Sequence, residues 1–321
     1  MTESSGKCIS VLVPTYNEEA NVVPLCERVM AVFAESLPQY RYEIVLIDNA
    51  STDGTRAKIE ALCAAHAHVR AIFNARNFGQ FRSPFYGICQ TTGDCTIPLC
   101  ADFQDPVELI PSLVAEWEHG YRVVCAVKTA SRENPVMRFC RTCYYRLLRR
   151  ASDVALIEHF TGFGLYDRRF VDVMRALDDP TPFLRGVVAE LGFRMTTVPY
   201  TQAKRRAGRT HNSLLSLYDA AWQSFTAYTK TPIRAVSAVG WLLLLSAVLS
   251  AVLLTVRTGA ASHTSFLWQL PLALFLSAVH LIALGVVGEY LLLLRDKVTQ
   301  RPLVVEERRL NFDKTNDARD A

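Results

Sequence analysis

Residues 98–106 read PLCADFQDP, which places two carboxylates, an amide and a thiol within six positions after an apolar run. Carboxylate and amide oxygens are ligands that hard divalent cations prefer, whereas the thiol of Cys100 suits such a cation poorly. Asp102 and Gln104 could therefore hold a divalent ion that bridges two phosphates. This chemistry favours binding of a diphosphate group.

Asp105 in the same stretch has two interpretations. It precedes Pro106 and Glu108, a pattern typical of a helix start in which Asp105 is the N-cap and Glu108 completes a capping box. This pattern favours capping over ligand binding, although both remain open. Asp102 and Gln104 are the better site candidates because they follow the end of a strand, where open α/β sheets bind their ligands.

Polar residues also follow two earlier predicted strands. Pro14, Thr15, Tyr16, Asn17 and Glu18 come at the end of the first strand, and Asp48 follows the second. Acidic groups at such a sheet edge can accept hydrogen bonds from a base or a ribose, so the three loops together predict a nucleotide-sized crevice. Simpler roles also remain open, since Asn17 could cap the first helix and Asp48 and Asp53 could serve the turn.

The elements that must position these loops alternate along the chain. Short strands are predicted over residues 8–14, 42–47, 69–73 and 95–99, and helical periodicity covers residues 19–37 and 56–67. This alternation is typical of a βαβ sheet and predicts an α/β fold. No GxGxxG follows the first strand, and no GxxxxGK[ST] occurs, which argues against a dinucleotide site and a P-loop. The HExxH motif of zinc proteases and the GxSxG motif of serine hydrolases do not occur either.

Two long apolar stretches follow residue 230. Residues 235–256 carry no charge over 22 positions, and residues 266–294 form a second candidate of 29 positions. A helix needs about 20 residues to cross a bilayer, so both stretches predict membrane-spanning helices. Lys and Arg number six in residues 199–234 and six in residues 295–314, while the connection between the stretches has only Arg257. We therefore expect both termini in the cytoplasm and the protein in the cytoplasmic (inner) membrane.

The segment before the first apolar stretch carries aromatic residues at helical spacing. Its position favours a helix in the membrane interface over one packed on its own domain.

The expected divisions are a cytoplasmic domain at 1–210, a juxtamembrane helix at 211–232, a two-helix membrane domain at 233–298 and a cytoplasmic tail at 299–321. All nine cysteines precede Ala151, which fits a reducing compartment. The net charge of +4 is modest and is concentrated beside the two apolar stretches, which favours anionic lipid headgroups over nucleic acid as partners.

Four motifs occur in the order VLVPTYNEEANV, VLIDNASTDGT, RNFGQ and ADFQDP. Together they resemble family 2 glycosyltransferases, which have an A-type nucleotide-sugar-binding (Rossmann-like) fold and invert the anomeric centre. FTGFGLYDRR, RRAGRTHN and GVVGEYLLLLRDKVTQRPL resemble the branch that includes dolichyl-phosphate mannose synthase and bacterial polyprenyl-phosphate glucosyltransferases. The resemblance implies transfer of one sugar from a nucleotide-diphosphate donor, UDP-linked by preference, to a polyprenyl phosphate at the cytoplasmic leaflet. Similar proteins can form tetramers.

The resemblance also implies roles for individual residues. It makes Asp102 and Gln104 the ligands of Mg²⁺ or Mn²⁺ in the donor site, and Asp102 and Arg205 the catalytic residues. The remaining nucleotide-sugar contacts that it implies are Pro14, Tyr16, Glu18 and Asp48. The basic residues that it assigns to donor or acceptor phosphates are Lys128, Arg132, Arg138 and Arg205.

The sequence departs from the family pattern at three places. Cys100 stands at the first Asp of the usual Asp-x-Asp, His211 replaces a common Lys, and Glu158 is the nearest substitute for a missing acidic residue. Two alternatives therefore stay open, an inactive membrane-tethered binding module and an enzyme that acts on a non-phosphate lipid. The second would need a general base, for which Glu158 and Asp105 are candidates. A polyprenyl phosphate needs none, since its second pKa of about 6 leaves it largely a dianion at pH 7.

Overall fold

The computed structural model describes residues 6–130, 157–177, 182–203 and 302–312, together with residue 179 and scattered positions between 273 and 298. The chain divides into two compact units. The first comprises Met1–Cys140, Ala155–His211 and Gln300–Ala321, and the second comprises Arg141–Val154 and Asn212–Thr299. The strands and the candidate site described below all belong to the first unit.

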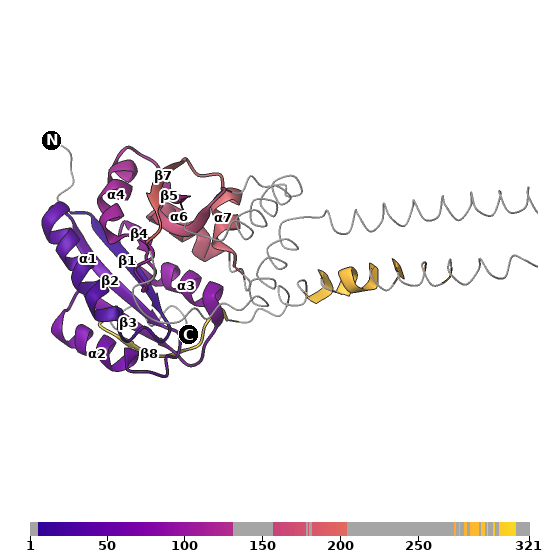
Figure 1. Ribbon diagram of the computed structural model, residues 1–321, viewed down its shortest axis with the longest axis horizontal. Helices are drawn as coiled ribbons and strands as arrows, with labels where there is room; N and C mark the ends of the chain where they lie inside the picture. The colour runs from indigo at the N-terminus through magenta and orange to yellow at the C-terminus, as the bar shows by residue number, and fades with distance from the viewer. Residues whose placement is uncertain are drawn as a thin grey trace, which may run out of the picture. The chain divides into compact units, whose positions relative to one another are not determined.

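A mixed sheet forms the frame of the first unit (Figure 1). Across the described part of the sheet the strand order is β7 (Met195–Thr201), β5 (Val123–Ala130), β6 (Phe160–Asp167), β4 (Cys95–Pro98), β1 (Cys8–Thr15), β2 (Arg41–Asp48), β3 (Val69–Asn74) and β8 (Glu306–Leu310). β1 pairs in parallel with β2 and β4, and β2 pairs in parallel with β3. β6 is antiparallel to both β4 and β5, and β7 is parallel to β5. The carboxyl ends of β1 to β5 and β7 therefore meet at one edge, which is the ligand-binding edge of open α/β sheets.

Helices cover both faces of this sheet. One face packs against α1 (Val22–Ser36), α2 (Thr55–Ala65) and α4 (Ile110–Glu118), and the other against α3 (Gly79–Gln90), α6 (Arg168–Ala176) and α7 (Leu184–Glu190). Along β1, Val11 and Val13 face the first layer, while Leu12 between them faces the second. This alternation is expected for a strand buried on both faces.

The α/β prediction is confirmed. Each of the four expected strands lies within one residue of its predicted bounds, and the second helix begins at Thr55. The first helix begins at Val22 rather than residue 19, because residues 17–21 form a loop that bonds to the neighbouring loop. The sequence did not lead us to expect α3 or β8, the strand that lies antiparallel to β3 at the end of the sheet.

The predicted membrane segments fall largely outside the described residues. Residues 211–232 and 235–256 lie outside them, and residues 266–294 are described only at scattered helical positions. Within the part of the chain that is described, the structure has no helix that is both long and apolar enough to cross a bilayer. The described positions near the end of the second stretch include these exposed apolar side chains: Leu284, Val287, Leu291, Leu292, Leu294 and Val298.

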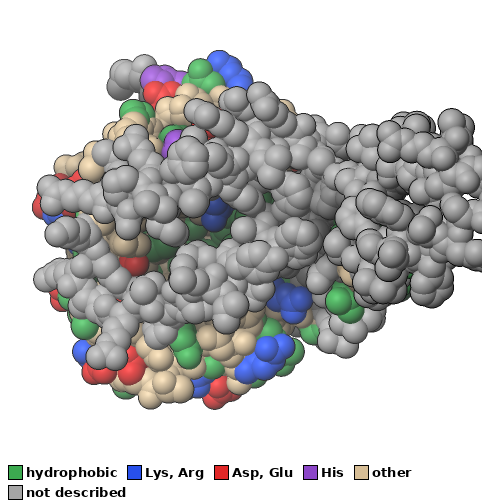
Figure 2. Space-filling model, turned by 45° about the vertical axis from the view of Figure 1, so that its right-hand side comes forward, with side chains coloured by type: hydrophobic (Ala, Val, Ile, Leu, Met, Phe, Trp, Pro, Cys, Tyr) green, Lys and Arg blue, Asp and Glu red, His purple; other side chains and the backbone are tan. Residues whose placement is uncertain are grey.

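The described part of the face shown in Figure 2 carries side chains of several kinds. Figure 2 shows acidic, basic and apolar side chains intermingled on the visible face, without one charge dominating its described part. Several opposite charges pair across elements, as Lys7 does with Glu118 and Arg28 with Glu108. The modest net charge of +4 is consistent with this pattern.

Candidate active site

The Asp48 side chain lies at the carboxyl end of β2 and is fully buried. Its Oδ2 accepts a hydrogen bond from the backbone N–H of Ser51 at 3.1 Å and from Nε of Arg56 at 2.8 Å. Its Oδ1 has no hydrogen-bond partner among the described residues. Because a buried acceptor without a partner costs about 1–3 kcal/mol, Oδ1 is suited to a donor from a ligand. Through its bond to the N–H of Ser51, Asp48 also stabilises the turn that follows β2.

The loops after β1 and β2 are joined by side-chain bonds. The N–H of Asn17 donates to Oγ of Ser51 at 2.9 Å, and Oδ1 of Asn17 accepts from the N–H of Thr52 at 2.8 Å. The N–H of Glu18 donates to Oγ1 of Thr55 at 2.9 Å. Asn17 has a φ of 54°, a left-handed conformation that asparagine tolerates better than most residues. Asn17 therefore holds the two loops together instead of capping α1.

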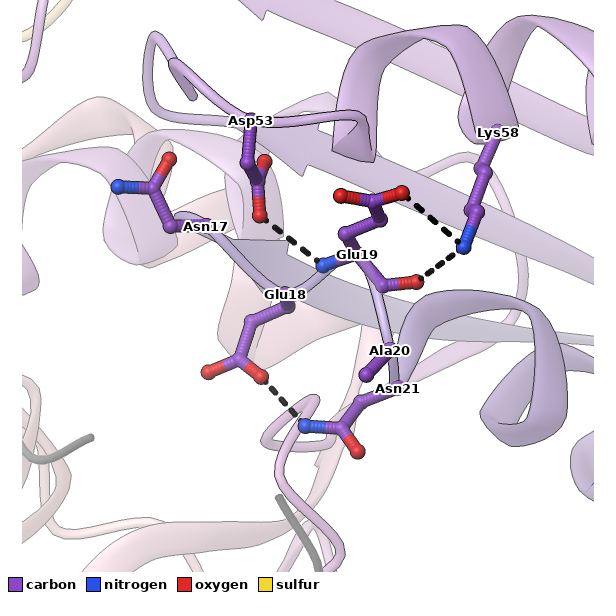
Figure 3. A pocket seen from close by; sticks show the side chains of 7 residues that line it. All are labelled: Asn17, Glu18, Glu19, Ala20, Asn21, Asp53 and Lys58. Atoms are coloured by element: carbon purple, nitrogen blue, oxygen red, sulfur yellow. Dashed lines mark hydrogen bonds and ion pairs between the residues drawn. The ribbon is translucent and has the colours of Figure 1, made fainter. Parts of the chain in front are cut away.

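A pocket of about 290 Å³ lies where these loops meet. Its lining consists of Asn17, Glu18, Glu19, Ala20, Asn21, Asp53 and Lys58 (Figure 3). Lys58 donates to the carbonyl of Glu19 and pairs with its carboxylate at 3.4 Å, while Glu18 accepts from Nδ2 of Asn21 at 2.7 Å. With three carboxylates and one lysine, the lining is suited to hydroxyl and N–H donors rather than to phosphates.

Asn49, next to Asp48, connects the site to the RNFGQ motif. Its Nδ2 donates to Oδ1 of Asn77 at 2.9 Å, and its Oδ1 accepts from the N–H of Phe78 at 2.9 Å and from Nδ2 of Asn74 at 3.1 Å. Asn77 also accepts from the N–H of Gly79, where α3 begins. The motif thus fixes the start of α3 against the end of β2.

The loop after β4 carries the predicted metal ligands. Oδ1 of Asp102 accepts a hydrogen bond from the N–H of Gln104 at 3.1 Å, which closes the loop around Phe103, whose φ is 59°. The carbonyl of Gln104 accepts from the N–H of Ala203, just after β7. Asp102 and Gln104 are both half-buried, so their side chains keep access to solvent.

Asp105 does not cap a helix, so that prediction is wrong. The helical turn begins at Val107, its N-cap residue is Pro106, and no side chain makes a capping bond there. Asp105 is instead buried, and its Oδ1 accepts from the hydroxyl of Tyr200 at 3.0 Å. A tertiary partner on β7 has displaced the local capping pattern. Glu108, the expected second half of the capping box, accepts from Nε of Arg28 at 2.9 Å.

The thiol of Cys100 also lies against Asp105. The residue as a whole keeps exposed surface, but desolvation of the sulfur, followed by the charges of Asp105 and Asp102, raises the pKa of the thiol well above its usual range. Burial likewise raises the pKa of Asp105, against the lowering effect of the Cys100 and Tyr200 bonds and of the Lys128 charge. The neutral thiol is therefore a hydrogen-bonding neighbour of the carboxylate.

The structure brings one predicted basic residue to this loop. Lys128 lies on β5 opposite Tyr200 of β7, and its charge acts on both Cys100 and Asp105. The other predicted phosphate-binding residues, Arg132, Arg138 and Arg205, lie outside the described residues. In the sequence they follow β5 and β7, whose carboxyl ends share the site's edge.

The predicted residues thus form two groups at one edge of the sheet. Pro14, Tyr16, Glu18 and Asp48 belong to the ends of β1 and β2, and Asp102, Gln104 and Lys128 belong to the β4, β5 and β7 side. Tyr200 and Arg56, which orient a carboxylate in each group, were missed by the sequence analysis because their partners are set by the tertiary fold. The one local indication for Arg56 is its place in VLIDNASTDGTR, where it follows Asp48 by eight positions.

The metal prediction can be compared with the available ligands. Among the described residues, no group of three or more His, Cys, Asp or Glu side chains is arranged to hold a metal ion by itself. Asp102 and Gln104 offer two hard oxygen donors on one short loop. This donor set fits Mg²⁺ or Mn²⁺ when phosphate oxygens and water complete the coordination.

The chain matches a known protein family. Residues 10–173 match the family model that is described as Glycosyl transferase family 2. A bactoprenol glucosyl transferase of Shigella phage SfX is 30% identical over 88% of this chain and 93% of its own length. An uncharacterized glycosyltransferase of Synechocystis sp. is 30% identical over 92% of this chain and 93% of its own length.

Among solved structures, mannosyl-3-phosphoglycerate synthase from Rubrobacter xylanophilus matches with a TM-score of 0.47 and 19% identity, over 69% of this chain and 73% of that one. The family match runs from β1 into α6 and so covers the loops after β1, β2 and β4, whereas β7 and β8 lie beyond it. The resemblance drawn from the motifs is therefore confirmed, including its bactoprenol glucosyltransferase-like branch. The chain belongs to family 2 of the glycosyltransferases.

Proposed function

We propose that this enzyme transfers a single hexose from a UDP-linked sugar to a polyprenyl phosphate at the cytoplasmic face of the membrane. Relatives named bactoprenol glucosyl transferase along most of the chain support a lipid acceptor and a hexose. The observation that carries the proposal is the pairing of a nucleoside-type site at β1 and β2 with hard oxygen ligands after β4, at the same edge of one sheet.

The nucleoside part of the donor is assigned to the loops after β1 and β2. The open Oδ1 of Asp48 can accept from a base N–H, and the acidic pocket beside Glu18 can accept from ribose hydroxyls. Three carboxylates in that pocket would repel a diphosphate. The diphosphate is therefore assigned to the other group, near Lys128.

Asp102 and Gln104 would hold the divalent ion in this proposal. The ion, when bound, stabilises the charge that develops on the departing diphosphate. Lys128 adds a positive charge from β5, and Arg132, Arg138 and Arg205 are proposed to contribute guanidinium groups from segments outside the described residues. Arginine suits this role because its planar fork binds a phosphate through two hydrogen bonds.

The acceptor does not require a general base. Asp105, one of the two candidates, is already engaged by Tyr200 and Cys100 and lies buried. A polyprenyl phosphate brings its own anionic oxygen as the nucleophile, so the enzyme needs to supply proximity, orientation and charge stabilisation. Inversion at the anomeric carbon follows if this oxygen attacks from the side opposite the diphosphate.

The chain outside the described residues is proposed to place this site at the membrane. Residues 235–256 and 266–294 would form two spans with both termini cytoplasmic, and residues 211–232 would form an interfacial helix between the domain at 1–210 and the membrane domain at 233–298. The site would then lie over the leaflet that contains the acceptor. Residues 299–321 would form the cytoplasmic tail, which includes β8.

The test uses the full chain in membranes with added polyprenyl phosphate. Radiolabelled UDP- and GDP-sugars are supplied in turn, and the lipid product is separated by chromatography. We expect label from a UDP-hexose in a lipid that mild acid hydrolyses readily, as a glycosyl phosphate should. An acid-stable product would indicate a lipid alcohol as the acceptor, and no turnover with Mg²⁺ or Mn²⁺ would favour the inactive binding module.

A further inference from the structure

Arg56 links the buried Asp48 to the C-terminal strand of the domain. Its Nε donates to Oδ2 of Asp48 at 2.8 Å, its Nη2 to the carbonyl of Asn74 at 2.9 Å and its Nη1 to Oε2 of Glu307 at 2.9 Å. Asp48 and Asn74 end β2 and β3, whereas Glu307 lies on β8, more than 230 residues farther along the chain. One guanidinium therefore connects three strands.

The three contacts determine how Arg56 binds Asp48. An arginine beside a carboxylate commonly donates to both of its oxygens in parallel. Here Nη2, which lies on the same side of the guanidinium as Nε, donates to the carbonyl of Asn74, and Nη1 on the opposite side donates to Glu307, so only Nε reaches Asp48 and only Oδ2 is taken. Oδ1 is left without a hydrogen-bond partner among the described residues.

β8 is well placed to hold Glu307 in position. The strand is antiparallel to β3, so its amino end, with Glu307, lies at the edge where the carboxyl ends of β2 and β3 meet. Arg308 pairs with Glu60 of α2, and Nδ2 of Asn311 donates to the carbonyls of Cys63 and Val69 at 2.7 Å each. The backbone at Glu307 is thus held by contacts of its own strand that do not involve Arg56.

We propose that Glu307 is a positioning residue for donor recognition. By holding Nη1, it fixes the orientation in which Nη2 stays on the carbonyl of Asn74 and Nε on Oδ2 of Asp48, which leaves Oδ1 for the nucleobase. The C-terminal strand is then part of the donor site, although it does not touch the donor itself. The inference rests on the proposed role of Asp48 in binding the donor nucleotide.

The Arg308–Glu60 pair provides a matched control. Glu60→Ala and Glu307→Ala each remove one half-exposed carboxylate from an arginine at the interface of β8 and α2. Only Glu307 reaches the arginine that binds Asp48. A merely structural role of β8 would therefore give the two variants similar effects on melting temperature and no difference in donor binding.

The experiment measures UDP binding by calorimetry and the KM and kcat for the UDP-sugar, using the full chain in detergent. We expect Glu307→Ala to raise the Kd for UDP and the donor KM about three- to tenfold with kcat within about twofold, and Glu307→Gln, which keeps an acceptor, to restore most of the loss. Glu60→Ala should leave both constants within about twofold of the parent.

Equal Kd and KM values in Glu307→Ala and Glu60→Ala would overturn the inference. So would a loss in Glu307→Ala that lies in kcat alone, because positioning of a binding group acts on donor affinity. If the parent enzyme binds UDP normally while Glu307→Ala is unchanged, the inference fails and the proposed function stands. If the parent binds no UDP but turns over another nucleotide sugar, the proposed donor is wrong, and the same comparison is made with that nucleotide.

Discussion

The hydroxyl of Tyr200 lies 3.0 Å from Oδ1 of Asp105, which ties β7 to the loop that follows β4. A second bond joins the same two segments, from the N–H of Ala203 to the carbonyl of Gln104. β4 and β7 both end at the edge that holds the candidate site, and the loop after β4 carries Asp102. The phenol–carboxylate bond therefore helps to set the position of the proposed metal ligands.

Tyr200→Phe tests this relationship. The change removes the hydroxyl donor from a buried carboxylate, which should lower stability by about 1–3 kcal/mol and weaken the Mg²⁺ or Mn²⁺ dependence of turnover. Tyr42→Phe is the control, since the Tyr42 ring stacks on Phe33 beneath α1 and does not belong to this loop. Thermal unfolding and metal titrations of both variants measure the two effects. An unchanged metal optimum in Tyr200→Phe would show that the bond serves the fold alone.

Asp105 should make stability depend on pH in a particular direction. Burial raises the pKa of Asp105 above its ordinary value, so the carboxyl group binds protons more readily in the folded than in the unfolded protein. The stability that it contributes is present below the ordinary pKa and is lost as the pH rises through the raised value. Asp105→Asn, which stays neutral, should therefore gain in melting temperature relative to the parent as the pH rises from about 4 to 7. A difference that is constant or that declines over this range would contradict the assignment.

Two substitutions in the loop after β4, Asp102→Ala and Cys100→Ser, should have different effects on turnover. Asp102→Ala removes a charged ligand and should lower turnover by more than about a hundredfold, with the metal optimum weakened or lost. Cys100→Ser keeps a hydrogen-bond donor beside Asp105 and should keep metal-dependent activity within about tenfold of the parent. Both variants are titrated with Mg²⁺ and Mn²⁺ in the same membranes after equal amounts of folded protein have been confirmed. An inactive Cys100→Ser beside an active Asp102→Ala would mean that the metal ligands are wrongly assigned.

Much of the half of the sheet that contains β1, β2 and β3 could be predicted from the sequence because its elements are specified locally. β1 and β2 are mainly apolar strands that are buried on both faces, and Asp48, which ends β2, stands at its predicted place. α3 was harder to foresee because it contains Pro84 and two glycines, Gly79 and Gly87, which are unfavourable in most helices. Packing of Phe85 and Ile88 against the sheet outweighs this preference.

Features that depend on distant partners could not be predicted. β8 has the sequence EERRL, which does not alternate between apolar and polar residues, and β3 supplies the backbone partners that make it a strand. The capping pattern at Asp105 was misleading for the same reason, since Tyr200 is 95 positions away. The role of Arg56 likewise depends on Glu307, which no local pattern connects to it.

Glu43 offers a test of the fold that is separate from the chemistry. Its buried carboxylate, on β2, accepts from Oγ of Ser10 at 2.5 Å and from the N–H of Thr92 at 2.8 Å, and it pairs with Arg70 at 2.7 Å. Glu43→Ala leaves these donors without their acceptor and should destabilise the domain by about 3 kcal/mol, which corresponds to a melting temperature lower by about 6–12 °C.

Glu35→Ala is the matched control for Glu43→Ala, because it removes an exposed carboxylate that lies 3.8 Å from Arg28. It should change stability by less than about 0.5 kcal/mol. At a temperature where both variants are folded, the donor KM should equal that of the parent, since neither residue lies at the carboxyl edge of the sheet. Similar melting temperatures for the two variants would show that the Glu43 network is not a main support of the first three strands, whereas a raised donor KM in Glu43→Ala alone would extend the site beyond the loops described above.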